Sequence, residues 1–179
     1  MTSASDSALA AILDWCADTG VEWEQASASE VVVVLPGEQK LRTTVSLSVA
    51  PDTVTVNAFV MRHPEENIPA IHRWLLERNR RIFGLAYALD HYGDVFLVGA
   101  LPTSGFDTEV MDRLAGAVLL HADEVFNHLL ELGFAHAITA EWRWRLEHGE
   151  STANLAAFEH LRPASGAVQE ANPAPDTAH

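Results

Sequence analysis

The sequence predicts an α+β fold in which helices pack on one face of an antiparallel sheet, made of a meander and a hairpin, with a helical C-terminal extension. Between residues 21 and 60, short runs of apolar residues alternate with polar ones and are separated by turn signals. Residues 83–101 form two apolar runs around a tight turn. Apolar residues at helical spacing come before, between and after these runs.

The first element is expected to be an amphipathic helix over residues 5–18. Ser5 or Asp6 can cap it, its apolar side ends at Cys16, and Gly20 stops it. Cys16 is the single cysteine, and no base accompanies it in the sequence. This position favours a buried structural residue over a nucleophile.

Four short strands should follow as an antiparallel meander. Residues 21–25 alternate, residues 31–35 are a continuous apolar run typical of a central strand, and residues 41–49 and 53–60 alternate again. One sheet face is therefore apolar and the other is rich in Thr and Ser. The polar face is expected to be solvated; the alternative is that it receives a peptide strand or a second subunit.

The centre of the core is expected between Trp74 and Pro102. A helix that Asn67 can cap ends in Arg78, Arg80 and Arg81, and a hairpin follows whose turn contains Gly93. Both faces of this hairpin are apolar, which indicates that neither faces water. The three arginines suit the end of a helix and pairing within the domain, or alternatively the carboxylates of a partner.

The C-terminal part should be helical. A long helix is expected from Asp107 or Thr108 to Leu132, with Gly133 as its C-cap. We predict an α+β domain over residues 1–134, a helical extension over residues 135–162 and a disordered tail over residues 163–179, which is rich in Ala, Pro and Ser.

Two groups of residues suggest a metal site, and both have simpler explanations. His121, Glu124 and His128 fall on one side of the long helix, but two turns of one helix rarely complete a coordination sphere, and a polar stripe is favoured. His63 lies near two glutamates in a loop without further ligands at suitable spacing. We therefore expect no metal, no cofactor and no catalytic residue.

Trp142 and Trp144 are the candidate contact residues of the extension. In a helix, Trp142 continues the apolar repeat of Phe134 and Ile138, whereas Trp144 falls off it and would mark a contact surface if exposed. The run Trp142–Arg145 could also form a strand. Nucleic-acid stacking by this run is disfavoured, because only two arginines accompany the tryptophans.

Composition narrows the function. The 179 residues carry 25 acidic and 11 basic side chains, for a net charge of −14, which argues against binding to nucleic acids or anionic membranes. One cysteine excludes an intrachain disulfide and fits the cytoplasm. Neither a signal peptide nor a membrane span is expected.

The central stretch resembles the YbjN family of bacterial sensory-transduction-regulator-like domains, in its actinobacterial form. The resemblance rests on Leu75-Leu76, Arg78-Asn79-Arg80-Arg81, the Gly84–Asp90 strand, Gly93–Gly99 and the later run Ala122–Phe134. It covers residues from about 20 to 134. It implies a fold like that of type III secretion chaperones, with no enzymatic residues to carry over.

The sequence therefore predicts a non-enzymatic interaction or regulatory module, chaperone- or adaptor-like, that binds a protein partner and forms a homodimer. The expected partner-binding residues are Arg78, Arg80, Arg81, Trp142 and Trp144. The alternative is a metal-dependent or acid–base enzyme that uses residues such as His121, Glu124 and His128, brought together by the fold.

Overall fold

The computed structural model describes residues 3–82 and 84–164. The chain divides into two compact units, Met1–Gly133 and Phe134–His179. The elements of the described residues are, in order, α1 (Ala4–Thr19), β1 (Glu22–Ser27), β2 (Glu30–Pro36), β3 (Arg42–Val49), β4 (Thr53–Met61), α2 (Ile68–Asn79), β5 (Leu85–Leu89), β6 (Val95–Pro102), α3 (Thr108–Ala122), α4 (Phe126–His148) and the 3-10 helix η1 (Ala153–Leu161).

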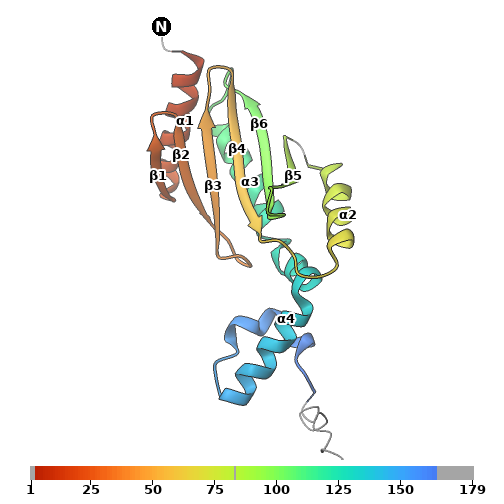
Figure 1. Cartoon of the computed structure of the whole chain (residues 1–179). Coiled ribbons are helices and arrows are strands. Elements are labelled where there is room, and N and C mark those ends of the chain that lie inside the picture. Colours follow the sequence, from red (N-terminus) through yellow and green to blue (C-terminus); the bar gives the residue numbers. More distant parts are fainter. Residues whose placement is uncertain (1–2, 83, 165–179) are drawn as a thin grey trace, which may run out of the picture. The chain divides into compact units, whose positions relative to one another are not determined.

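The first unit is built on one six-stranded sheet in which all neighbours are antiparallel. The strand order is β1-β2-β3-β4-β6-β5, so the return strand of the hairpin lies between β4 and β5 (Figure 1). Val98 pairs with Asn57 on one side and with Ala86 on the other. The predicted α+β fold, with meander and hairpin in one sheet, is confirmed.

Helices α1 and α3 pack against each other and on one face of the sheet (Figure 1). Every second residue of β2, β3 and β4 is buried, which is the pattern of a sheet with one covered face. Trp15 of α1 donates from Nε1 to Asp112 of α3 at 3.1 Å. Cys16 is fully buried, and burial raises the pKa of its thiol, as fits a structural residue.

Helix α1 begins at Ala4, one residue before the predicted range. Ser3, and neither Ser5 nor Asp6, is its N-cap, because the Ser3 hydroxyl accepts from the Asp6 N–H while the Asp6 carboxylate accepts from the Ser3 N–H, both at 3.1 Å. This reciprocal pair is a capping box.

The two faces of the hairpin are buried to different degrees. Leu85, Tyr87 and Leu97 are buried in the core. On the opposite face, the side chains of residues 86, 88, 96 and 98 are half-buried, so this face is less enclosed than its apolar composition predicts.

The prediction of a single long helix up to Leu132 is wrong, because a turn at residues 123–125 separates α3 from α4. Asp107 does cap α3, accepting from the Val110 N–H at 2.8 Å. The carboxylate of Asp123 accepts three backbone N–H bonds from the loop between β2 and β3, from Glu38, Gln39 and Lys40, at 2.9, 3.0 and 2.7 Å. This tertiary contact accompanies the interruption of the helix.

Gly133 is not the C-cap that the sequence predicts, because α4 continues through it. A Cβ atom at this position would lie 2.8 Å from Pro64 and 3.1 Å from Ile71, so glycine allows close packing. The Gly133 carbonyl accepts from the N–H groups of Glu65 and Glu66 at 3.0 and 3.2 Å. The backbone becomes non-helical at the next residue, Phe134, with φ −146° and ψ 21°.

The second unit contains the remainder of α4 and η1. Its buried residues include Ile138, Trp142, Leu155 and Phe158. The strand alternative for Trp142–Arg145 is wrong, since these residues are helical. The expectation of a disordered tail over residues 163–179 falls mostly on residues 165–179, which lie outside the described residues.

Candidate partner-binding site

The three predicted arginines lie together where α2 ends. Arg78 is half-buried, and its guanidinium lies over the Trp74 ring at 4.6 Å from the centroid, a cation–π contact. Arg80 and Arg81 are exposed. With Trp74 and Glu77, the three arginines line a hollow of about 480 Å³.

The end of α2 is fixed to the edge strand β5 by one side chain. The Asn79 side-chain oxygen accepts from the Tyr87 N–H at 2.7 Å, and its amide nitrogen donates to the Tyr87 carbonyl at 3.2 Å. An edge strand would otherwise leave these two backbone groups unpaired. Asn79 therefore holds the arginine-bearing end of α2 against the sheet.

Trp74, which lines the hollow, packs against further aromatic side chains. The Tyr87 hydroxyl donates to the His121 carbonyl at 2.7 Å, and the Trp74 ring lies 6.2 Å from Tyr87 and 5.3 Å from His128. Burial raises the pKa of Tyr87 to about 12, although the charge of Arg78 opposes the shift. Tyr87 is therefore a neutral hydrogen-bond donor at physiological pH.

The fold does not assemble the alternative site from His121, Glu124 and His128. His121 packs against Tyr87, His128 packs against Trp74, and Glu124 is exposed. Burial, and then the positive charge of Arg78, lower the pKa of His121 against the opposing effect of Glu124. Within residues 3–82 and 84–164, no three or more His, Cys, Asp or Glu side chains are grouped to hold a metal ion.

The two candidate tryptophans of the second unit have different environments. Trp142 is 1% exposed, donates from Nε1 to the Phe158 carbonyl at 3.1 Å and has the Arg162 guanidinium 5.5 Å from its ring. Trp144 is 48% exposed and stacks on His148 at 4.6 Å between centroids. Trp142 thus belongs to the core of this unit, and Trp144 is accessible.

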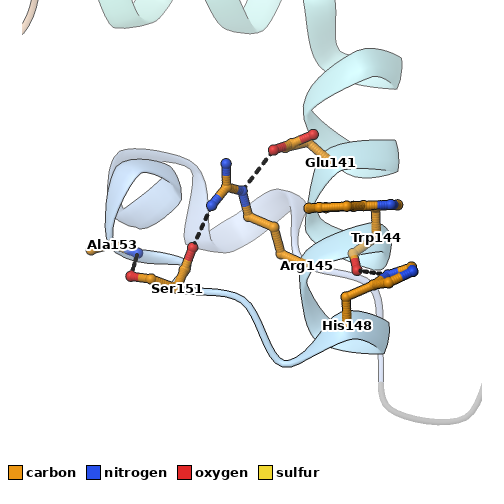
Figure 2. Close-up of polar contacts among 6 residues, drawn as sticks. All are labelled: Glu141, Trp144, Arg145, His148, Ser151 and Ala153. Atoms are coloured by element: carbon orange, nitrogen blue, oxygen red, sulfur yellow. Dashed lines mark hydrogen bonds and ion pairs between the residues drawn. The ribbon is translucent and has the colours of Figure 1, made fainter.

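The helix that carries Trp144 is joined to the following loop by Arg145. Figure 2 shows Arg145 bridging the Glu141 carboxylate, at 2.6 Å, and the Ser151 carbonyl, at 2.7 Å, while Trp144 and His148 lie one above the other on the same helix. This side chain is only 23% exposed, so the bridge is better shielded than a surface ion pair. It fixes the loop beside the accessible tryptophan.

Sequence reasoning missed two residues with strong tertiary roles, Asn79 and Asp123. Both lie in runs that carry the family resemblance, and Asp123 is also expected within the long helix, but the sequence predicts no tertiary contact for either. Both are short polar residues within helical patterns, where Asn and Asp are poor helix formers. That mismatch is the signal that could have marked them.

No helix in the described residues is long and apolar enough to cross a membrane.

Comparison with known proteins places the chain in a family. A family model named YbjN, described as "Putative bacterial sensory transduction regulator", matches residues 8–131. Uncharacterized proteins of Mycobacterium tuberculosis and Mycobacterium bovis are each 52% identical over 133 residues, which are 74% of this chain and 73% of theirs. An uncharacterized protein of Mycobacterium leprae is 49% identical over 131 residues, 73% of this chain and 71% of that protein.

Among solved structures, a chain of the ExsC-ExsE complex is similar with a TM-score of 0.52 and 18% identity, over 67% of this chain and 91% of that one. This likeness concerns the fold alone, and it confirms the chaperone-like α+β architecture that the resemblance implies. The family match covers most of the first unit, including the arginines at the end of α2. The chain therefore belongs to the YbjN family.

Proposed function

We propose that the chain is a non-enzymatic protein-binding module, an adaptor or regulator, in which Arg78, Arg80 and Arg81 contact acidic groups of the partner. The observation that carries this proposal is the hollow of about 480 Å³ that these arginines line beside Trp74. Guanidinium groups pair with carboxylates through two parallel hydrogen bonds, and Arg and Trp are enriched among residues that dominate interfaces.

Two of the three arginines of this site, Arg80 and Arg81, form no ion pair within the described residues. In the described residues, ion pairs join Arg42, Arg73 and Arg113 to glutamates, whereas Arg80 and Arg81 have no carboxylate within 4.0 Å. The chain as a whole carries a net charge of −14. A positively charged site on an otherwise acidic protein favours an acidic partner. The negative charge of the remaining surface repels such a partner, so association is directed to the positive site.

The comparisons support this class of function. The family description names a regulator, and the similar chain with a TM-score of 0.52 belongs to a complex of two proteins. A homodimer in which the exposed Trp144 contributes to the interface, and a cytoplasmic location, are further parts of the proposal. The single cysteine, which is buried, is compatible with a reducing compartment.

The experiment compares captured partners of three full-length proteins. The test variant is Arg80→Glu with Arg81→Glu, and the control, Arg42→Glu with Arg62→Glu, makes the same change in net charge at exposed positions elsewhere. Proteins captured by the wild type should be retained by the control and lost from the test variant. If the test variant retains every partner at wild-type level, the arginines are not the binding site.

A further inference from the structure

A second hollow lies on the core side of the hairpin, between its strands and α3. Its volume is about 510 Å³, within the roughly 300–1,000 Å³ typical of small-molecule pockets. The buried side chains of Leu85, Phe106 and Leu114 form part of its wall, and they come from β5, from the loop before α3 and from α3 itself. The hollow is thus bounded by three separate segments of the first unit.

The lining residues of α3 show that the hollow is elongated. Val110, Arg113, Leu114, Ala117 and His121 are spaced so that they share one side of the helix. From Val110 to His121 the helix rises about 16 Å, at roughly 1.5 Å per residue. We call this elongated hollow the α3 groove.

The chemistry of the α3 groove is apolar with a few polar groups. Among the described residues, 13 line the groove; only Ser104, Arg113 and His121 of these have polar side chains, and none of the 13 is acidic. Acidic residues outnumber basic ones in the chain by 25 to 11, so the absence of acidic residues among these 13 departs from the composition of the chain as a whole. Few polar groups on an apolar lining are the usual composition of a small-ligand site.

Arg113 supplies the positive charge of the lining. Its guanidinium lies 3.7 Å from the Glu109 carboxylate, and the two side chains are 68% and 78% exposed. Such an exposed pair contributes little and is easily exchanged for a better partner. Burial and the charge of Arg78 lower the pKa of His121, so this ring adds a polar but uncharged group at neutral pH.

We propose that the α3 groove binds a small amphipathic carboxylate, whose aliphatic chain lies along α3 and whose carboxylate meets the Arg113 guanidinium. The apolar lining accepts the chain, and the positive charge beside it selects an anionic end over a neutral or cationic one. A small ligand suits this hollow, because its volume of about 510 Å³ lies within the range typical of small-molecule pockets. This inference does not depend on the proposed function.

The probe is decanoate, with decanol as the uncharged molecule of the same chain length. Each is titrated into the full-length protein below its aggregation concentration, by calorimetry and by native mass spectrometry. We expect saturable binding of one decanoate per chain and binding of decanol that is weaker by about tenfold, because the alcohol lacks the charge-assisted bond to Arg113. Failure of decanoate to bind, or equal binding of the two, overturns the proposal.

Two pairs of variants locate the site. Ala117→Trp places a large side chain in the groove and should abolish binding, whereas Gly116→Trp, at an exposed position one residue earlier where a Cβ meets no atom within 4 Å, should keep it. Arg113→Gln should weaken the binding of decanoate by about tenfold and leave the binding of decanol unchanged. Arg42→Gln removes another exposed arginine that pairs with a glutamate and should change neither.

Circular dichroism tests whether each variant is folded. If Ala117→Trp does not fold, the comparison of Arg113→Gln with wild type decides whether the α3 groove binds the carboxylate. Unchanged decanoate binding by folded Ala117→Trp, or by Arg113→Gln, overturns the proposal. Because the assay uses a purified protein and leaves Arg80 and Arg81 intact, its result is independent of the partner-capture experiment.

Discussion

Asp123 joins two parts of the first unit that lie far apart in the sequence. It is 5% exposed, and its carboxylate accepts three N–H bonds from residues 38–40, more than 80 positions earlier in the chain. A Cβ atom on Gly37 would collide with this carboxylate, so glycine is required where the loop wraps around it. Three charge-assisted bonds to one buried side chain make the position sensitive to small changes.

Replacing Asp123 by Asn should lower the free energy of unfolding by about 2 kcal/mol, because hydrogen bonds to a charged group are weakened and an amide nitrogen faces backbone donors. Urea unfolding measures the loss. The neighbouring Glu124 is exposed, so Glu124→Gln is the matched control and should stay within about 0.5 kcal/mol of wild type. Equal stability of the two variants would show that the loop does not depend on this carboxylate.

Lys40 makes stability depend on pH. Its ammonium group donates to the Phe59 carbonyl and lies 4.8 Å from the centroid of the Phe59 ring. Burial lowers the pKa of Lys40 from 10.5 to about 8, against the opposing charge of Asp123. Between these values the unfolded chain holds a proton that the folded chain has released, so this group makes stability rise with pH.

The stability of wild type relative to Lys40→Met should therefore increase from pH 8 to about pH 10 and stay level below pH 8. Urea unfolding of both proteins at several pH values gives the difference, in which the contributions of Tyr87 and Cys16 cancel. A difference that does not change with pH would mean that Lys40 keeps its ordinary pKa in the folded protein.

At the scale of elements, α2 protects an edge of the sheet. β5 is the last strand in the sheet order, and the Asn79 amide pairs with the backbone of Tyr87 as a neighbouring strand would. Unpaired edge groups are a route to association between chains. The side chain that positions the arginine hollow thus also closes the edge.

Asn79→Ala should lower the free energy of unfolding by about 1–2 kcal/mol, because the backbone of Tyr87 loses two hydrogen bonds. It should also increase self-association on standing, as measured by light scattering alongside urea unfolding. Asn57 is exposed on β4, so Asn57→Ala is the control and should behave as wild type. If Asn79→Ala is as stable and as dispersed as this control, the amide does not protect the edge.

At the scale of the whole molecule, the chain consists of two units that meet in sequence at residues 133 and 134. The first contains the entire sheet with α1, α2 and α3. A protein truncated after Gly133 keeps the carbonyl that accepts from Glu65 and Glu66. We expect this fragment to unfold in one cooperative transition, because it retains a complete core.

Thermal unfolding followed by circular dichroism tests the fragment. Its near-ultraviolet signal should disappear in a single step together with its far-ultraviolet signal. A control that ends at Leu129 removes the Leu132 and Gly133 carbonyls, which accept from Asn67 and from the loop before α2. It should be less stable. A fragment ending at Gly133 with no cooperative transition would show that the first unit depends on the second.

The proposed homodimer predicts a mass of twice 19.5 kDa by light scattering in the micromolar range. Trp144→Ala should lower the dimer fraction, because an exposed tryptophan contributes large apolar area to an interface. Leu146→Ala, at a 43% exposed position two residues later, is the control and should leave the mass unchanged. A monomer at every concentration would exclude the homodimer.

Local patterns in the sequence determine much of the secondary structure of this protein. Alternation over residues 42–49 and the apolar run at 31–35 specify strands, because side chains on a strand point alternately to its two faces and only one orientation buries the apolar set. Helical spacing specifies α1 and α2 in the same way. The cluster of Arg78, Arg80 and Arg81 can be recognised in the sequence because its members are close together in the chain. The YbjN resemblance can be recognised because it rests on short continuous runs of residues.

Only the tertiary structure decided which distant residues meet. It broke the expected long helix at Asp123, placed β6 between β4 and β5, and buried Trp142 while exposing Trp144. It also brought α3 against the hairpin to form the α3 groove. Periodicity indicates which side of an element is buried but not what lies against it, because that depends on how close-packed side chains far apart in sequence fit together.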